Sequence, residues 1–334
     1  MLLYAVRRLL AVPFILLGVS VVLFLLTHIM PGDPAKVMAG EHASPKTVEI
    51  IRQEFGLDKP LPEQYRIYIT NLLHGNLGIS IVTHRRISED ISMYFMATME
   101  LTIAAMLLTV VMGVPLGILS ATKKDTILDH LLRFISLSGV SLPVFWLALV
   151  LQLILYRQLN LLPIGGRLDV MQTPPPMVTG LFTVDSLLAL DFRAFGETLR
   201  HLALPAFTLA FSSLAVVSRM TRSSMLEILS QDYIRTAQAK GLAAWAILYR
   251  HALRNAAIPT LTVIGLQAGV LLSGAFLIEA IFNWPGLGLY TTRAITRLDY
   301  PAIMGTSLLI TLVFILLNLV VDLLYGLADP RIRY

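Results

Sequence analysis

Six stretches of apolar residues divide this chain of 334 residues. They are Leu9–Ile29, Leu101–Ala121, Leu132–Leu155, Leu204–Arg222, Pro259–Ala280 and Ile303–Gly326. A helix of about 20 apolar residues is as long as the hydrocarbon core of a bilayer is thick, about 30 Å. Charged residues make up 14% of the chain, well below the roughly 25% of soluble domains. The pattern predicts an all-α polytopic membrane protein with six transmembrane helices.

Basic residues gather in alternate loops, which indicates how the chain crosses the membrane, because cytoplasmic loops are enriched in Lys and Arg. With the N-terminus inside, the cytoplasmic segments carry Arg7, Arg8, Lys123, Lys124, Arg133, Arg219, Arg222, Arg235, Lys240, Arg250, Arg254, Arg331 and Arg333. Their acidic residues are only Asp125, Asp129, Glu227, Asp232 and Asp329. Both termini are therefore predicted to be cytoplasmic. The net charge of +5 is a topology signal, and no basic-aromatic surface accompanies it to suggest nucleic acid.

The first apolar stretch is too long for a signal-peptide core, and no small-residue cleavage site follows it. We therefore expect residues 1–30 to form an anchor helix, 31–97 an external helical cap, 98–327 the transmembrane core and 328–334 a cytoplasmic tail. In the cap, one helix is predicted from Ser44-Pro45 to Gly56 and another from Pro62 to His74. A second external segment contains Pro174-Pro175-Pro176, which favours extended backbone.

The cytoplasmic segment 222–258 has the features of a short helix rather than of a simple connector. Ser230 is a candidate N-cap, Asp232 suits the positive end of a helix dipole, and Lys240 suits the negative end. Gly241 can adopt the left-handed conformation that ends many helices. A second helical stretch is expected from Ala243 to Asn255, before the fifth span opens around Pro259.

The sequence contains no recognisable catalytic, nucleotide-binding or metal-binding motif. It lacks the Gly-x-x-x-x-Gly-Lys-Ser/Thr loop that cradles nucleotide phosphates, so any ATP-derived energy must come from another polypeptide. Cysteine is absent, which excludes disulfides, thiolate zinc sites and Cys-ligated iron–sulfur clusters. The seven histidines show no metal-ligand spacing, and no Ser, His and carboxylate constellation suggests a hydrolase. We expect no enzyme, no metal and no cofactor in this chain.

Several short motifs occur in a collinear order across almost the whole chain. They are Arg7-Arg8-Leu9, Pro31-Gly32-Asp33-Pro34, His74-Gly75-Asn76-Leu77-Gly78-Ile79-Ser80, His251-Ala252-Leu253-Arg254-Asn255, Phe282-Asn283-Trp284-Pro285-Gly286-Leu287-Gly288 and Val321-Asp322-Leu323-Leu324-Tyr325 followed by Asp329-Pro330-Arg331-Ile332. In this order they resemble the signatures of peptide and nickel ABC-importer permeases. The segment 222–258 is similar to the coupling loop of that family, with Arg235 where the general pattern has Glu and Ile258-Pro259 further downstream.

The resemblance implies the type I ABC-importer permease fold, an anchor helix plus a five-helix core, in the bacterial cytoplasmic membrane. It also implies a homologous second permease, two cytoplasmic ATPase subunits that bind ATP and Mg²⁺, an external substrate-binding protein and a peptide substrate. The residues implied to couple to the ATPase are Asp232, Tyr233, Ile234, Arg235, Thr236, Ala237, Lys240, Gly241 and Leu242. Ala237 and Ala239 permit close approach there, while Tyr233, Ile234 and Leu242 supply apolar area. A solvated loop that only carries positive charge is the alternative for this segment.

The polar and small residues of the fifth span have two possible roles, helix packing and lining of the transport pathway. Gly265, Gly269, Ser273 and Gly274 form a small-residue face suited to close helix packing. Gln267 and Ser273 are instead candidates for lining the transport pathway. Pro143 is expected to kink the third span.

A pair near the cytoplasmic end of the sixth span, Asn318 and Asp322, lies on one helix face. It is interpreted as a structural hydrogen-bonded pair, with gating as the alternative.

The external turn Trp284-Pro285-Gly286 is a candidate contact for the binding protein. For the substrate, the overall resemblance favours dipeptides over oligopeptides, glutathione, haem or nickel complexes. An ion-coupled secondary transporter is the rival class. It is disfavoured because the central turns of all six spans lack Asp, Glu, Lys, Arg and His.

Overall fold

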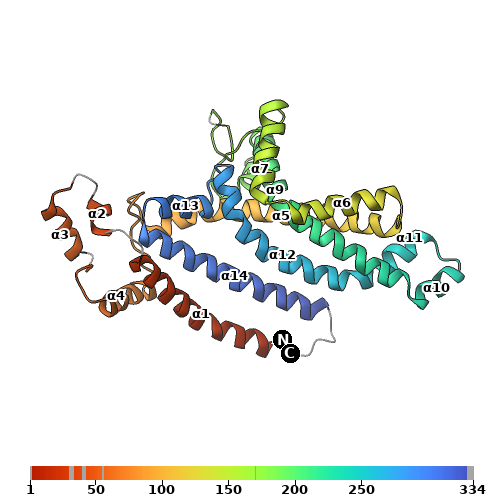
Figure 1. The fold of residues 1–334 in the computed structure, drawn as a ribbon, viewed down its shortest axis with the longest axis horizontal. Helices are drawn as coiled ribbons and strands as arrows, with labels where there is room; N and C mark the ends of the chain where they lie inside the picture. Colours follow the sequence, from red (N-terminus) through yellow and green to blue (C-terminus); the bar gives the residue numbers. More distant parts are fainter. Residues whose placement is uncertain (1, 30–33, 40–42, 55, 170, 329–334) are drawn as a thin grey trace. The chain divides into compact units, whose positions relative to one another are not determined.

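The computed structural model describes residues 2–29, 34–39, 43–54, 56–169 and 171–328, and this part of the chain is helices joined by loops (Figure 1). The long helices are α1 (Leu2–Ile29), α5 (Ile87–Thr122), α9 (Phe192–Leu229), α12 (Leu253–Ile281) and α14 (Tyr300–Ala328). The shorter ones are α2 (Pro34–Ala39), α3 (Pro45–Glu54), α4 (Leu61–Leu73), α6 (Ile127–Ser141), α7 (Val144–Leu151), η1 (Gln152–Gln158), α8 (Phe182–Leu188), α10 (Asp232–Ala239), α11 (Ala244–Ala246), η2 (Ile247–Ala252) and α13 (Leu287–Thr296). Across the described ranges no strand forms, and β pairing is limited to a bridge between Ile79 and Arg86.

Five of the described helices are long and apolar enough to cross a membrane, and a sixth span results if the bent pair α6–α7 counts as one. The predicted all-α membrane fold is thus confirmed. The pair meets at an angle of 110°. Leu142 is extended, with ψ 132°, because the residue before a proline avoids the helical region, and α7 begins after Pro143. Pro143 was expected to kink the third span, and it interrupts the helix altogether.

The fourth span differs most from its prediction. It was expected to begin at Leu204, next to Pro205, but α9 begins at Phe192 and runs to Leu229. Asp191 caps it, since its Oδ1 accepts a hydrogen bond from the Ala194 N–H at 2.9 Å. Pro205 lies inside the helix. At 38 residues, α9 is about 57 Å long and exceeds the thickness of a hydrocarbon core.

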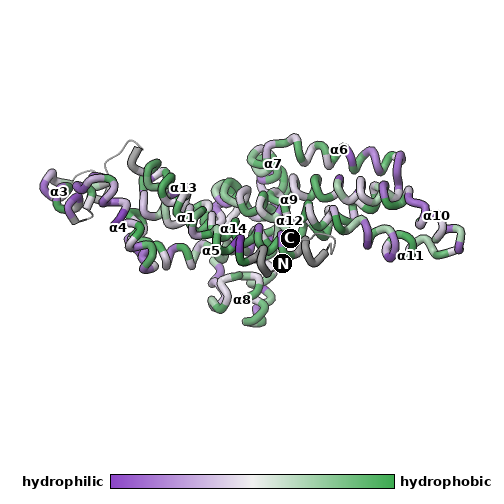
Figure 2. Tube along the Cα trace, turned by 90° about the horizontal axis from the view of Figure 1, so that it is seen from below, coloured by the Kyte–Doolittle hydropathy of each residue, from purple (hydrophilic) through white to green (hydrophobic). Residues whose placement is uncertain are grey.

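The chain divides into two compact units, and one of them comprises Thr98–Trp284 together with the end of α14. Helix α9 is its most buried element, and α6, α8 and α12 pack against it. Close approach depends on small residues. A Cβ on Gly139 of α6 would lie 2.7 Å from the Ala215 Cβ, and one on Gly117 of α5 would lie 2.6 Å from the Ser218 carbonyl oxygen. Figure 2 shows the mainly apolar colour of α7, α9 and α12, in contrast to the hydrophilic α10.

A buried ion pair ties together one end of this unit. The Nε of Arg167 donates to Glu100 Oε2 at 3.1 Å, and both side chains are almost completely buried. The guanidinium also lies over the Phe182 ring, 3.6 Å from its centroid. Burial lowers the pKa of Arg167, and the Glu100 carboxylate opposes that shift. The loop before Arg167 is held by the end of α12, because the Gly166 N–H donates to the Phe282 carbonyl at 2.9 Å.

The other unit comprises Leu2–Ala97 and Pro285–Leu316. It contains the two predicted cap helices. Helix α3 begins after Ser44, whose Oγ accepts from the Thr47 N–H at 3.2 Å, and α4 ends before His74. Gly56, predicted to end α3, has a left-handed backbone with φ +64°.

Two buried carboxylates, Asp90 and Asp299, connect segments of this second unit, and one of them binds Ser80 at the end of the motif that begins at His74. Asp299 accepts from the Ser80 hydroxyl at 2.5 Å, and Asp90 accepts from the Tyr290 hydroxyl at 3.0 Å. The first bond joins the segment between α4 and α5 to the residue before α14, and the second joins the start of α5 to α13. The motif residues Pro31–Asp33 and Asp329–Ile332, and all of the predicted tail except residue 328, lie outside the described residues.

Candidate coupling site

Helix α10 is the short helix predicted from its end signals, and it lies beyond the ends of α9 and α12 (Figure 1). Asp232 occupies its first turn as expected. The expected N-cap at Ser230 is wrong. Helix α9 continues to Leu229, and Ser230 closes it by donating its hydroxyl to the Glu227 carbonyl at 2.7 Å. Gln231 occupies the N-cap position and makes no side-chain capping bond.

The C-terminal end of α10 is held by a pair of backbone hydrogen bonds. The Gly241 N–H donates to the Gln238 carbonyl at 2.9 Å, and the Leu242 N–H donates to the Ala237 carbonyl at 3.3 Å. These two bonds make a Schellman motif. Gly241 has φ +76°, which confirms the predicted left-handed conformation. An added Cβ would meet nothing within 4 Å, so the demand for glycine is set by the backbone and not by crowding.

One face of α10 is buried against the rest of the chain. Ile234 is fully buried and Ala237 is 7% exposed. They share a cluster with residues of α5, α9, η2 and α12: Ile118, Ala121, Met225, Ile247, Ala252 and Ala256. The sequence analysis assigned Ile234 and Ala237 to the surface that meets the ATPase. That assignment needs correction, because residues three apart lie on one helix face and here that face packs inward.

The remaining predicted coupling residues are accessible. Tyr233 and Leu242 are exposed, and the exposed pair Arg235–Asp232 has an Nη1 to Oδ1 distance of 3.2 Å. Such exposed pairs contribute only about 0–1 kcal/mol. Also exposed are Asp232, Thr236, Ala239, Lys240 and Gly241.

Sequence analysis missed two large aromatic residues that follow α10. Trp245 on α11 is 68% exposed, and Tyr249 on η2 is 56% exposed. Large aromatic side chains on a polar loop are a usable signal, because Trp and Tyr are enriched in protein interfaces. The predicted helix from Ala243 to Asn255 instead runs as α11 and the π-helix η2 directly into α12, and Pro259 lies inside α12.

The two candidate pathway residues of the fifth span are not brought together. Gln267 accepts a hydrogen bond from the Ser213 hydroxyl on α9, at 2.8 Å, so it contributes to packing within the bundle. Ser273 is exposed, and its hydroxyl donates to the Gly269 carbonyl of its own helix at 3.1 Å. On the small-residue face of α12, Gly269 is buried and Gly274 approaches Leu209 of α9.

The predicted external contact also needs correction at its first residue, Trp284. Trp284 is completely buried, with the Arg167 guanidinium 5.7 Å from its ring centroid, and Gly286 is buried as well. Pro285 is partly exposed. The Trp284 indole is therefore not accessible for contact with another protein. Within the described ranges, no group of three or more His, Asp or Glu side chains is placed to hold a metal ion.

Comparison with known proteins extends over the whole chain. Residues 113–334 match the family of binding-protein-dependent transport system inner membrane components, and residues 1–102 match the N-terminal region of such membrane components. A probable D,D-dipeptide transport system permease protein of Escherichia coli is 49% identical over 94% of this chain and 93% of its own. A dipeptide transport system permease protein of Alkalihalophilus pseudofirmus is 46% identical over the full length of both. A glutathione transport system permease protein of Pectobacterium atrosepticum is 39% identical over the full length of both. The chain therefore belongs to the binding-protein-dependent transport system inner membrane components, and it is a multi-pass permease subunit of an ABC importer.

Proposed function

We propose that this permease moves dipeptides into the cytoplasm, driven by ATP that partner subunits hydrolyse. Relatives named as dipeptide permeases share 43–49% identity with it over nearly full length, whereas the glutathione permeases share 39%. The difference supports a dipeptide substrate over glutathione. ATP and Mg²⁺ belong on the ATPase subunits, since the chain has no phosphate-binding loop of its own.

The proposed orientation has both termini and α10 in the cytoplasm. It is supported by the excess of Lys and Arg in the loops on that side. A second, homologous permease completes the translocation pathway, and a substrate-binding protein delivers the peptide from outside. In this arrangement residues 31–97 form a cap on the external side, and Gln267 and Ser273 are the candidates for polar groups along the pathway.

The observation that carries the coupling proposal is the attachment of α10 to the spanning helices. Its buried face packs on the ends of α5 and α9 and on the η2–α12 segment through one apolar cluster. A push on α10 therefore reaches three spanning helices through close packing, which transmits small displacements because packed interiors are poorly compressible. The exposed face, with Tyr233, Arg235 and Leu242, is left to meet the ATPase, together with Trp245 and Tyr249.

The mechanism that follows is alternating access. Closure of the two ATPase subunits on ATP moves the two α10 regions, the bundle opens outward and accepts the peptide from the binding protein, and hydrolysis resets it toward the cytoplasm. The role of this chain is positional throughout, because it binds, orients and releases the peptide without changing a covalent bond.

Reconstitution tests this proposal. The chain is co-expressed with its partner subunits, purified through a tag and placed in liposomes, and uptake of a radiolabelled dipeptide is measured. Uptake that needs ATP on the ATPase side and binding protein on the other is the expected result, with unlabelled dipeptide competing better than glutathione. Uptake by this chain alone under an ion gradient would instead identify a secondary carrier.

A further inference from the structure

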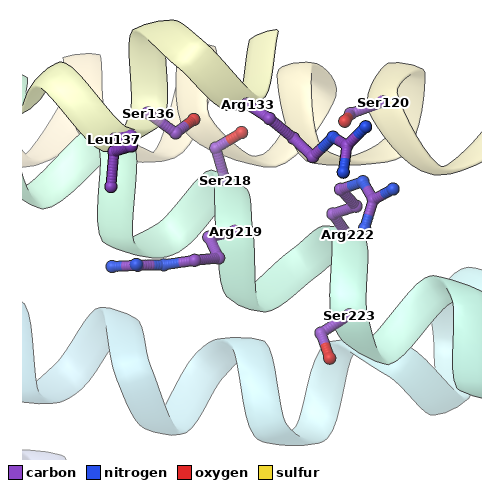
Figure 3. A pocket seen from close by; sticks show the side chains of 8 residues that line it. All are labelled: Ser120, Arg133, Ser136, Leu137, Ser218, Arg219, Arg222 and Ser223. Carbon is purple, nitrogen blue, oxygen red and sulfur yellow. The ribbon is translucent and has the colours of Figure 1, made fainter. Parts of the chain in front are cut away.

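A cavity of about 390 Å³, lined mainly by serine and arginine residues, lies between α5, α6 and α9, near the end of the bundle that carries α10. Figure 3 shows the guanidinium groups of Arg133 and Arg222 close together and the hydroxyls of Ser136 and Ser218 turned toward each other. The lining is completed by Ser120, Leu137, Arg219 and Ser223. Except for Leu137, every lining side chain can donate a hydrogen bond.

The cavity carries more positive charge than the chain neutralises. Asp129 is fully buried and receives both Nε and Nη2 of Arg222, each at 2.8 Å. The Nε of Arg133 lies 3.6 Å from the same carboxylate. Asp129 also accepts from the Ser120 hydroxyl at 2.5 Å and from the Asp125 N–H at 3.1 Å. This one carboxylate, already engaged by Arg222, Arg133 and Ser120, is the acid that contacts the lining, whereas the lining contains three arginines, of which Arg219 makes no contact with it.

Several donors in the cavity have no partner within the described part of the chain. Ser218 is only 3% exposed, and its hydroxyl makes no hydrogen bond there. Arg219 and Ser136 have none in that part of the chain either. The Ser218 hydroxyl and the exposed Arg219 guanidinium are therefore available to donate to a ligand that carries acceptor oxygens. Donors alone, with excess positive charge, match the acceptor oxygens of a phosphate.

An apolar surface continues outward from the cavity along α6. Leu131, Phe134 and Leu137 recur at helical spacing and are 52%, 67% and 60% exposed. Leu137 belongs both to this face and to the cavity lining. A ligand with a phosphate head and an apolar tail fits both surfaces at once, and basic pockets between spanning helices on the cytoplasmic side bind anionic lipid head groups.

We propose that this cavity binds the phosphate head group of an anionic phospholipid, with an acyl chain along the Leu131, Phe134 and Leu137 face. Assignment of the lipid to the inner leaflet rests on the proposed orientation of the permease. The lipid would hold α5, α6 and α9 together directly beside the cluster that anchors α10, since Ser120 and Ala121 are neighbours in sequence.

Native mass spectrometry of the purified transporter complex, in a neutral detergent, tests the proposal with phosphatidylglycerol, phosphatidylcholine or inorganic phosphate added. Phosphatidylglycerol should bind tighter than phosphatidylcholine, and Arg219→Gln should weaken it about tenfold, as expected for loss of a charge-assisted hydrogen bond. Ser218→Ala should weaken it several-fold. Arg200→Gln is the matched control, because Arg200 is an exposed arginine on the same helix that pairs with Glu197, away from the cavity.

Four results would overturn the proposal. Equal binding of the two lipids, or an unchanged affinity in Arg219→Gln, would show that the cavity does not select an anionic head group. Inorganic phosphate that displaces phosphatidylglycerol at similar concentration would indicate a site for a soluble anion. Loss of partner subunits from Arg219→Gln, with lipid binding intact, would indicate that a partner's carboxylate uses the site. Since binding is read without ATP or peptide, failure here leaves the transport proposal untouched.

Discussion

Replacing Ile234 with alanine should loosen α10 from the spanning helices while the rest of the bundle stays folded. The side chain is fully buried in the cluster formed with the ends of α5, α9 and α12. Truncation of a buried isoleucine to alanine costs about 3 kcal/mol, which corresponds to about a 100-fold larger equilibrium constant for local opening. In the reconstituted transporter, ATP hydrolysis should persist and dipeptide uptake should fall, because the displacement of α10 no longer reaches the bundle.

Hydrogen exchange of the purified full-length chain measures the opening directly. Amides of α10 should lose protection about 100-fold in Ile234→Ala, while amides in the middle of α9 keep theirs. Ile127→Ala is the matched control, since it deletes the same atoms from a side chain that is 87% exposed. Unchanged exchange in α10, or uptake equal to the wild type, would refute the reasoning that this cluster links α10 to the bundle.

Three further substitutions test individual contacts. Gly241→Val should reduce uptake more than Gly241→Asn, since left-handed backbone costs a non-glycine residue about 1–2 kcal/mol and Asn tolerates it best; equal uptake would count against the Schellman end. Arg167→Met should lower the melting temperature by leaving the Glu100 charge buried alone, at a cost of about 3–5 kcal/mol, and Glu100→Gln in addition should restore part of it; no restoration would mean the pair is not coupled. Gly165→Ala should destabilise the protein because its Cβ would overlap the Phe282 carbonyl oxygen, whereas the Cβ of Gly196→Ala would meet nothing within 4 Å; equal melting temperatures would contradict the packing of the loop that contains Gly165.

The positions of the spanning helices could be predicted where the local sequence alone determines them. A run of apolar residues long enough to span a bilayer has few alternatives, so the spans were located from the sequence. The bend at Pro143 shows the limit of that approach. Proline stops a helix through local geometry, but the 110° between α6 and α7 depends on how each half packs. Likewise, Ser230 ends α9 instead of starting the next helix, because the last turns of α9 pack against the buried cluster around Met225.

At the candidate site, the sequence predicted that α10 exists but did not lead to a correct prediction of which face of α10 is buried. Asp232 near the start, Gly241 after the end and the short distance between them predict a short helix that ends at Gly241. The spacing of Ile234 and Ala237 predicts one apolar face of α10. The prediction was wrong in assigning this face to the ATPase contact, since it packs against other helices of the same chain. The burial of Trp284 had no local signal, because its neighbour Arg167 lies far away in sequence.

Site-specific cross-linking tests the central claim, that the exposed face of α10 docks on the ATPase. The chain has no cysteine, so a single introduced thiol gives no background. In the purified complex, Arg235→Cys labelled with a photoactivatable maleimide should cross-link to an ATPase subunit, and Thr292→Cys, exposed on α13, should not. A cross-link to the ATPase from Thr292→Cys and none from Arg235→Cys would contradict the account.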